Sequence, residues 1–171
     1  VEGITDLRDL QDRITSCIGP NGEVLDSATP ILGELRRQVR QAYERVKDAL
    51  EGIIQSPAGR EALQDQVIST RGERLVLQVK TELRHRISGV VHDASNTGAT
   101  MFVEPFATTD LCNEWRELVL EEERETAVVL RDLSTLIGYA AEDISRGTEL
   151  TARLDFILAR ARYSAMLGGV A

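Results

Sequence analysis

The sequence predicts a mainly α-helical protein with a small antiparallel β insertion. Apolar side chains recur over residues 30–55 at alternating spacings of three and four, the heptad pattern of a helix packed lengthwise on another helix. Residues 87–105, ISGVVHDASNTGATMFVEP, instead read as two short strands around a polar turn. Only 4% of the residues are aromatic, which favours a core of Ala, Leu and Val. We therefore expect a long antiparallel helix pair, with a helical base, that carries a four-stranded sheet at its tip.

The composition is that of a globular protein. Apolar residues make up 42% of the 171 residues. No apolar run approaches the ~20 residues that a membrane-spanning helix needs. The chain begins at Val1 without a basic, apolar leader, so we expect a piece of a longer cytoplasmic protein with no membrane partner. Cys17 and Cys112 are expected to be buried thiols, and no Cys/His cluster indicates a metal site.

Capping residues mark the predicted helix boundaries. Residues 5–18 have apolar side chains at helical spacing and stop at the Gly-Pro-Asn-Gly run of residues 19–22. Thr29 is suited to cap the next helix, with Pro30 at its first position and an end near residue 55. The predicted seam of this helix consists of Leu32, Leu35, Val39, Ala42, Val46, Ala49 and Ile53.

Four short strands are expected next. Residues 66–70 are rich in β-branched side chains, and residues 74–80 alternate between apolar and polar. The third and fourth strands lie within residues 87–105, where Ile87 and Val91 are predicted to share an apolar face. The connections are too short for crossovers, which predicts antiparallel pairing.

A very long helix is expected after the last strand. Thr108 or Thr109 is suited to cap it, and its apolar stripe continues until Gly147 is expected to end it. Thr148 is then predicted to cap a last helix. The acidic run of residues 121–125 interrupts the stripe, and we interpret it as a solvated face, with an acidic docking site as the alternative.

The net charge of −8 is unevenly distributed. Residues 66–104 carry five basic and four acidic side chains, so this segment is +1 and the remainder is −9. A basic spot can contact nucleic-acid phosphates, and such binding depends on salt but not on base sequence. The same cations could also be a solvated surface that protects strand edges from aggregation. The candidate phosphate contacts are Arg71, Arg74, Lys80, Arg84, His85 and Arg86.

The other polar residues of the strand region are predicted to be structural. His92 and Asp93 are adjacent on a strand, so their side chains point to opposite faces and cannot form the base and orienting acid of a hydrolytic triad. Asp93, Ser95 and Gly98 are expected to shape the turn. The sequence contains no glycine-rich phosphate-binding loop. We therefore predict no catalytic residue and expect no cofactor in these 171 residues.

Several segments carry a family resemblance. They are RGER at 71–74, LQVK at 77–80, GVVHDAS at 89–95, GATMFVEP at 98–105, LCN at 111–113 and EEE at 121–123. These segments resemble the core and clamp region of the MutS-type ATPases. The branch they resemble in particular lacks the mismatch-reading domain and carries a C-terminal Smr nuclease domain. The chain departs from the family pattern at Ala94, in the turn of residues 95–98 and at Cys112.

The resemblance implies a domain organisation and a function. Residues 1–56 and 106–171 would form a helical core and lever, and residues 57–105 a β clamp subdomain. Two such arms of a homodimer would enclose duplex or branched DNA without reading its sequence. ATP and Mg²⁺ would be bound elsewhere in the longer parent protein, and endonuclease activity would also belong to the parent. The implied role is DNA repair through control of recombination, including suppression of homologous recombination, or rescue of stalled ribosomes.

The segment of residues 102–104 requires a separate interpretation. Phe102-Val103-Glu104 spells the Phe-x-Glu wedge of mismatch-repair MutS proteins, but it lies in the implied clamp, so Phe102 is predicted to be a core or sheet-face residue. Glu104 is expected to hold the loop before the long helix.

The alternative function is a coiled-coil interaction arm that docks on a ribosome or a partner protein. The piece alone is expected to be monomeric, because family dimers form mainly through the ATPase part.

Overall fold

The computed structural model describes residues 5–168. Its contacts divide the chain into a first unit, Val1–Ala28 with Ala127–Ala171, and a second unit, Thr29–Thr126. The second unit groups the sheet with the helices it packs on. This grouping follows contacts rather than secondary structure, and the separation of residues 57–105 from a helical part stays a prediction.

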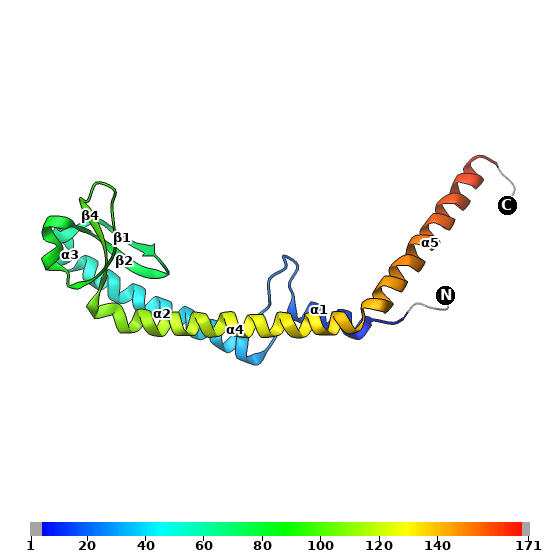
Figure 1. The fold of residues 1–171 in the computed structure, drawn as a ribbon, viewed down its shortest axis with the longest axis horizontal. Helices are drawn as coiled ribbons and strands as arrows, with labels where there is room; N and C mark the ends of the chain where they lie inside the picture. The colour runs from blue at the N-terminus through cyan, green and yellow to red at the C-terminus, as the bar shows by residue number, and fades with distance from the viewer. Residues whose placement is uncertain (1–4, 169–171) are drawn as a thin grey trace. The chain divides into compact units, whose positions relative to one another are not determined.

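In the second unit, α2 (Pro30–Gln55) pairs with the N-terminal part of α4 (Thr109–Tyr139) (Figure 1). The Thr29 side chain accepts a hydrogen bond from Leu32 N, which confirms the predicted cap. Ion pairs connect the helices, among them Arg36–Glu122 at 2.8 Å and Arg45–Glu114 at 2.7 Å. Residue number rises along α2 as it falls along α4, so the two helices are antiparallel.

The buried face of α2 differs from the predicted heptad seam in its second half. The fully or nearly fully buried residues are Leu32, Ala42, Val46, Leu50 and Ile54. From Ala42 onward they advance by four, whereas the heptad pattern predicted Ala49 and Ile53. A straight helix has 3.6 residues per turn, so its buried face drifts away from a 3.5-residue repeat.

A short helix, α3 (Pro57–Ala62), follows α2 directly and was not predicted. Ser56 ends α2, and its hydroxyl accepts a hydrogen bond from Gly59 N to cap α3. Gly59 lies so close to α2 that a Cβ atom there would be 2.0 Å from Ile53 O. This close approach turns the chain back toward the sheet.

The sheet has four antiparallel strands, as predicted, in the order β1-β2-β4-β3. Their bounds are β1 Leu63–Arg71, β2 Arg74–Lys80, β3 Gly89–Ala94 and β4 Thr100–Pro105. The connection between β2 and β3 is a 3-10 helix, η1 (Thr81–Arg86). The strand β4 therefore lies between β2 and β3, which leaves β1 and β3 as the two edges.

One face of the sheet packs on α2 and α4 to form the core. Val46, Leu50 and Ile54 of α2 meet a cluster of buried side chains, Ala62, Leu63, Leu75, Leu77, Val79, Ile87, Val103 and Cys112. Phe102 is 7% exposed, in agreement with its predicted structural role. Val91 pairs with the buried Val103 and so points to the predicted face, but it is not buried there, since it is 43% exposed while Ile87 is 5% exposed. The reason is that β3 is an edge strand whose register shifts between Val91 and Asp93.

The long helix ends earlier than predicted. A short 3-10 turn, η2 (Phe106–Thr108), precedes α4, and a break at Ala140 separates α4 from α5 (Ala141–Met166). Gly147 therefore lies inside α5 and ends no helix. Thr148 does not cap one either, because its hydroxyl donates to Ile144 O one turn back. A single glycine costs an exposed helix only about 1 kcal/mol, which is too little to stop it.

In the first unit, α1 (Arg8–Cys17) corresponds to the predicted helix of residues 5–18. A bridge between Ile18 and Val24 closes the loop that follows. Cys17 is buried and unpaired, and so is Cys112 in the second unit, as predicted. Among residues 5–168, no helix combines the length and apolar character that a membrane span requires.

Gly89→Ala is expected to lower the free energy of unfolding by roughly 1–3 kcal/mol, because overpacking forces the backbone apart. A Cβ atom at Gly89 would lie 2.1 Å from Glu104 O on the paired strand. Gly52→Ala is the matched control, since nothing lies within 4 Å of its Cβ position in α2. The control should gain about 0.5–1 kcal/mol from helix propensity. Urea denaturation of both variants measures the difference, and a neutral Gly89→Ala would contradict the close approach.

Candidate functional site

The six predicted phosphate contacts lie in two groups at opposite ends of β2. Arg71 and Arg74 flank the turn between β1 and β2. The other four lie at or after the far end of β2, and they are Lys80, Arg84, His85 and Arg86. A seven-residue strand spans roughly 20 Å, so the two groups do not share one small surface.

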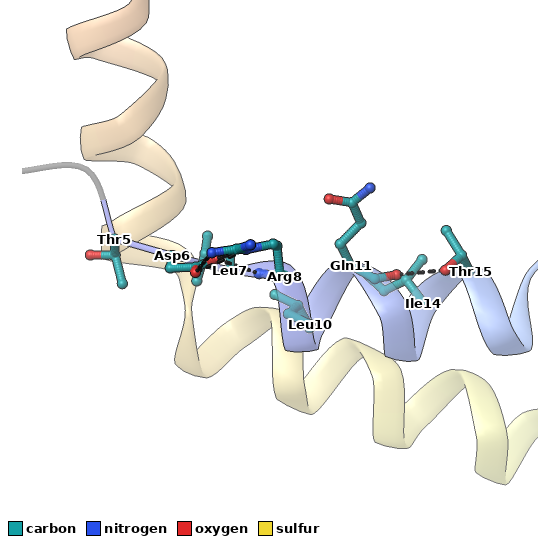
Figure 2. Close-up of a pocket in the computed structure, with 8 residues that line it drawn as sticks. All are labelled: Thr5, Asp6, Leu7, Arg8, Leu10, Gln11, Ile14 and Thr15. Atoms are coloured by element: carbon teal, nitrogen blue, oxygen red, sulfur yellow. Dashed lines mark hydrogen bonds and ion pairs between the residues drawn. The ribbon is translucent and has the colours of Figure 1, made fainter. Parts of the chain in front are cut away.

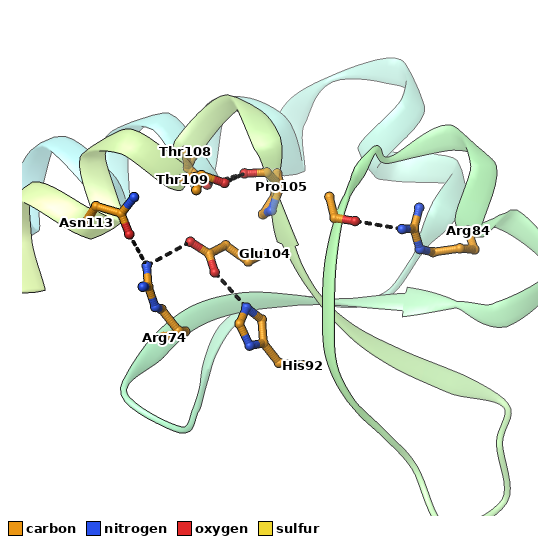
Figure 3. Close-up of polar contacts among 9 residues, drawn as sticks. Arg74, Arg84, His92, Glu104, Pro105, Thr108, Thr109 and Asn113 are labelled. Carbon is orange, nitrogen blue, oxygen red and sulfur yellow. Dashed lines mark hydrogen bonds and ion pairs between the residues drawn. The ribbon is translucent and has the colours of Figure 1, made fainter.

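Arg71 and Arg74 both have partners within the second unit. The Arg71 guanidinium lies 3.7 Å from the Phe102 ring centroid and its Nε is 3.3 Å from Asp93 Oδ2. This arrangement combines a cation–π contact with an ion pair. Arg74 Nη1 donates to Asn113 Oδ1 at 2.7 Å and lies 3.3 Å from Glu104 Oε1 (Figure 3). The two arginines therefore connect side chains of neighbouring strands on the face of the sheet opposite the core, and Arg74 also contacts α4.

Arg84 is also engaged, in this case by backbone oxygens. Its Nη1 donates to Ile87 O at 3.0 Å and its Nη2 to Gly89 O at 2.7 Å. Carbonyl groups at the start of an edge strand would otherwise need water as a donor. Arg84 thus holds η1 against the beginning of β3.

Two of the remaining basic residues, Lys80 and Arg86, contact Glu61 at the end of α3. Lys80 Nζ donates to Glu61 O at 3.2 Å, and Arg86 Nη2 lies 3.5 Å from Glu61 Oε1. The side chains of Arg86 and Glu61 are both about half exposed (50% and 52%), and such pairs contribute little to stability. His85 is exposed.

Arg60 is a candidate that the sequence reasoning missed. It is an exposed residue in the last turn of α3, which packs against η1. The missed signal was Ser56 followed by Pro57, which is a helix start and not only a helix end. We call Arg60, Lys80, His85 and Arg86 the tip group. Its charge is partly offset by Glu61 and by the exposed Glu82 of η1.

The predicted turn residues lie between β3 and β4. Asp93 Oδ1 accepts from Ala94 N at 2.8 Å, and Ser95 Oγ accepts from Thr100 N at 3.1 Å. Gly98 has a φ of +70°, a conformation that favours glycine. His92 and Asp93 have different partners, since His92 faces Glu104 and Asp93 faces Arg71. They therefore do not form a catalytic pair.

The acidic run is solvated only in part, because two of its carboxylates face α2 while its other three residues are exposed as predicted. Glu122 pairs with Arg36, and Glu125 accepts a hydrogen bond from the Thr29 hydroxyl at 2.8 Å. Charges spaced three residues apart lie on one side of a helix, so these two reach the same partner helix. The run thus contributes to helix pairing.

The first unit has a surface hollow along α1 (Figure 2). Its apolar lining is Leu7, Leu10 and Ile14, the side chains that made residues 5–18 amphipathic in sequence. At its rim, the Arg8 guanidinium beside Asp6 lowers the pKa of that carboxyl. Over residues 5–168, no three His, Cys, Asp or Glu side chains come together as a metal site would require.

Comparison with known proteins finds relatives over almost the entire chain. It is 42% identical over 164 residues to a protein named Endonuclease MutS2 from Pelotomaculum thermopropionicum, and 37% identical over 163 residues to one from Clostridioides difficile. A third, from Halalkalibacterium halodurans, is 42% identical over 160 residues. These alignments cover 94–96% of the chain, which spans only about one fifth (20–21%) of each relative. No protein-family model matches the chain.

Proposed function

We propose that this chain, which is homologous along nearly its whole length to one segment of the bacterial MutS2 endonucleases, is a non-catalytic arm that contacts DNA. The DNA would be duplex or branched and bound without regard to sequence. The longer protein would supply ATP and Mg²⁺ binding, the endonuclease activity and a second copy in a homodimer. Its proposed role is the control of recombination or the rescue of stalled ribosomes.

The observation that carries this proposal is the tip group. Its cations are brought together by the packing of α3 on η1, and the Arg86–Glu61 pair is half exposed. Phosphate oxygens could therefore compete for Arg86 at little cost to the fold. Arg71, Arg74 and Arg84 would first have to leave their partners within the sheet. We place phosphate contact mainly on the tip group.

Replacing Arg60 and Arg86 with Ala is expected to weaken binding of the chain to a duplex and to a four-way DNA junction. If both cations neutralise phosphates, the slope of log affinity against log salt should fall by roughly 2. Fluorescence anisotropy over a range of salt concentrations measures that slope.

The matched control is the Arg37→Ala/Lys47→Ala variant of α2. It removes the same charge, and both cations form exposed ion pairs, with Glu34 and Glu44, three residues away. The slope of the control should remain that of the unaltered chain. Equal losses in the two variants, or binding that does not depend on salt, would exclude phosphate contact by the tip group. The alternative of a protein-interaction arm would then be preferred.

A further inference from the structure

One buried carboxylate connects three strands of the sheet to the beginning of α4. Glu104 of β4 is 2% exposed, and its Oε2 lies 2.6 Å from His92 Nε2 of β3 (Figure 3). Its other oxygen, Oε1, lies 3.3 Å from Arg74 Nη1 of β2. The same Arg74 nitrogen donates to Asn113 Oδ1 of α4 at 2.7 Å. A continuous series of polar contacts therefore crosses from the edge strand β3 to the helix.

A second contact joins the β1–β2 hairpin, to which Arg74 belongs, to α4. Glu73, in the turn between β1 and β2, has a φ of +66°, and its Oε2 lies 2.5 Å from Arg116 Nη2. Asn113 and Arg116 are three residues apart, so they lie on one side of α4. The end of the β1–β2 hairpin is thus held at two points about one helical turn apart, and this arrangement restricts rotation of the sheet against the helix.

Glu104 also lies beside the first turns of α4. Burial, followed by the negative charge of Glu104, raises the pKa of the Cys112 thiol to about 11. The backbone between Pro105 and α4 is only the three-residue η2, where the Thr108 hydroxyl donates to Pro105 O at 3.0 Å. The Glu104 carboxylate and η2 therefore both lie where β4 leads into α4.

A buried ionic cluster of this kind adds little net stability compared with an apolar replacement, but its contacts are directional. We infer that Arg74, His92, Glu104 and Asn113 form a joint that sets the orientation of the sheet on α4. Through this joint, a displacement of α4 would be transmitted to the sheet and its tip group. This joint would act in the same way whether or not the tip group contacts DNA.

The other polar contacts of the sheet do not serve this purpose. Arg84 donates to the backbone oxygens of Ile87 and Gly89, and Arg71 contacts Phe102 and Asp93, so neither arginine connects the sheet to α4 through these contacts. Arg45 does reach α4, at Glu114, but from α2. Removing Arg45 is therefore a matched control, because it breaks a contact next to Asn113 without touching the sheet.

The test measures a distance between two spin labels, on Asn96→Cys in the β3–β4 turn and Glu117→Cys on α4, both exposed positions. The native Cys17 and Cys112 are both buried, which limits access of the label, and the raised pKa of the Cys112 thiol further slows its reaction. In the doubly labelled chain, Glu104→Gln and Asn113→Ala should each make the distance distribution about twofold wider than in the parent, since the directional contacts are lost. The Arg45→Ala control should keep the parent width.

Asn113→Ala leaves Glu104 paired with Arg74 and His92, so it decides the question if Glu104→Gln does not fold. If the distance distribution between the two labels is as narrow in the variants that fold as in the parent, the inference is overturned. An equal widening in Arg45→Ala would overturn it too, because the effect would then be a general loosening of α4. DNA is absent from this measurement, so its outcome is separate from that of the salt-dependence experiment.

Discussion

Replacing Arg74 with Met is expected to lower the free energy of unfolding by about 3–5 kcal/mol, which is the usual cost of leaving a buried charge without its partner. Glu104 would stay buried at 2% exposure without its arginine partner, with His92 Nε2 still 2.6 Å from its Oε2. Asn113 would also lose the donor to its side-chain oxygen. Urea denaturation of the chain, followed by circular dichroism, measures the change.

The double variant Arg74→Met/Glu104→Leu distinguishes two causes of the loss in stability. Both variants lack the Arg74 side chain, but only the single variant leaves the buried Glu104 carboxyl without it. The double variant should recover most of the lost stability, since apolar replacement of a buried ion pair is often neutral. Arg37→Met is the exposed control, because the Arg37 and Glu34 side chains are 57% and 45% exposed. It should cost less than about 1 kcal/mol. If Arg74→Met lowers the free energy of unfolding no more than Arg37→Met does, the buried Glu104 carboxylate does not need Arg74 for stability.

Leu77→Ala is expected to lower the free energy of unfolding by about 2–5 kcal/mol through the loss of buried surface and the cavity that remains. Leu77 is completely buried in the middle of β2, where it is paired with Ile68 of β1 and Val103 of β4. It belongs to the core that also includes Val46 and Leu50 of α2.

Val67→Ala is the matched control for Leu77→Ala. Val67 belongs to the edge strand β1 and is 51% exposed, so its truncation should stay within about 0.5 kcal/mol of the unaltered chain. Thermal unfolding of both variants tests the difference. Similar melting temperatures for the two would contradict the assignment of the core to the α2-facing side of the sheet.

The boundaries that could be predicted are those with strong local signals. The helix α2 has the predicted bounds because Thr29 supplies a cap and Pro30 is tolerated at the first position. The strand β2 has the predicted bounds because its side chains alternate and it ends at turns on both sides. Signals of this kind depend on neighbours within a few residues, so the sequence displays them directly.

The features that could not be predicted depend on contacts between distant residues. The helix break at Ala140 carries no stronger local signal than Gly147, which remains helical. Val91 alternates correctly but lies on an edge strand, and that follows from the position of β4 between β2 and β3. In the candidate site, the sequence identified the basic residues, but neither Arg60 nor the partners of Arg74 and Arg84.

The sequence by itself determined the helical class, the antiparallel insertion, the turn chemistry of residues 95–98 and the basic character of residues 71–86. Periodicity, capping and turn residues act locally, and they are sufficient for such features. Only the tertiary structure decided that Arg71 and Arg74 lie at one end of β2 and the tip group at the other. It also decided that Glu104 is buried among side chains from β2, β3 and α4. Both follow from strand order and packing, because a charge is neutralised by whichever group the fold brings within hydrogen-bonding distance.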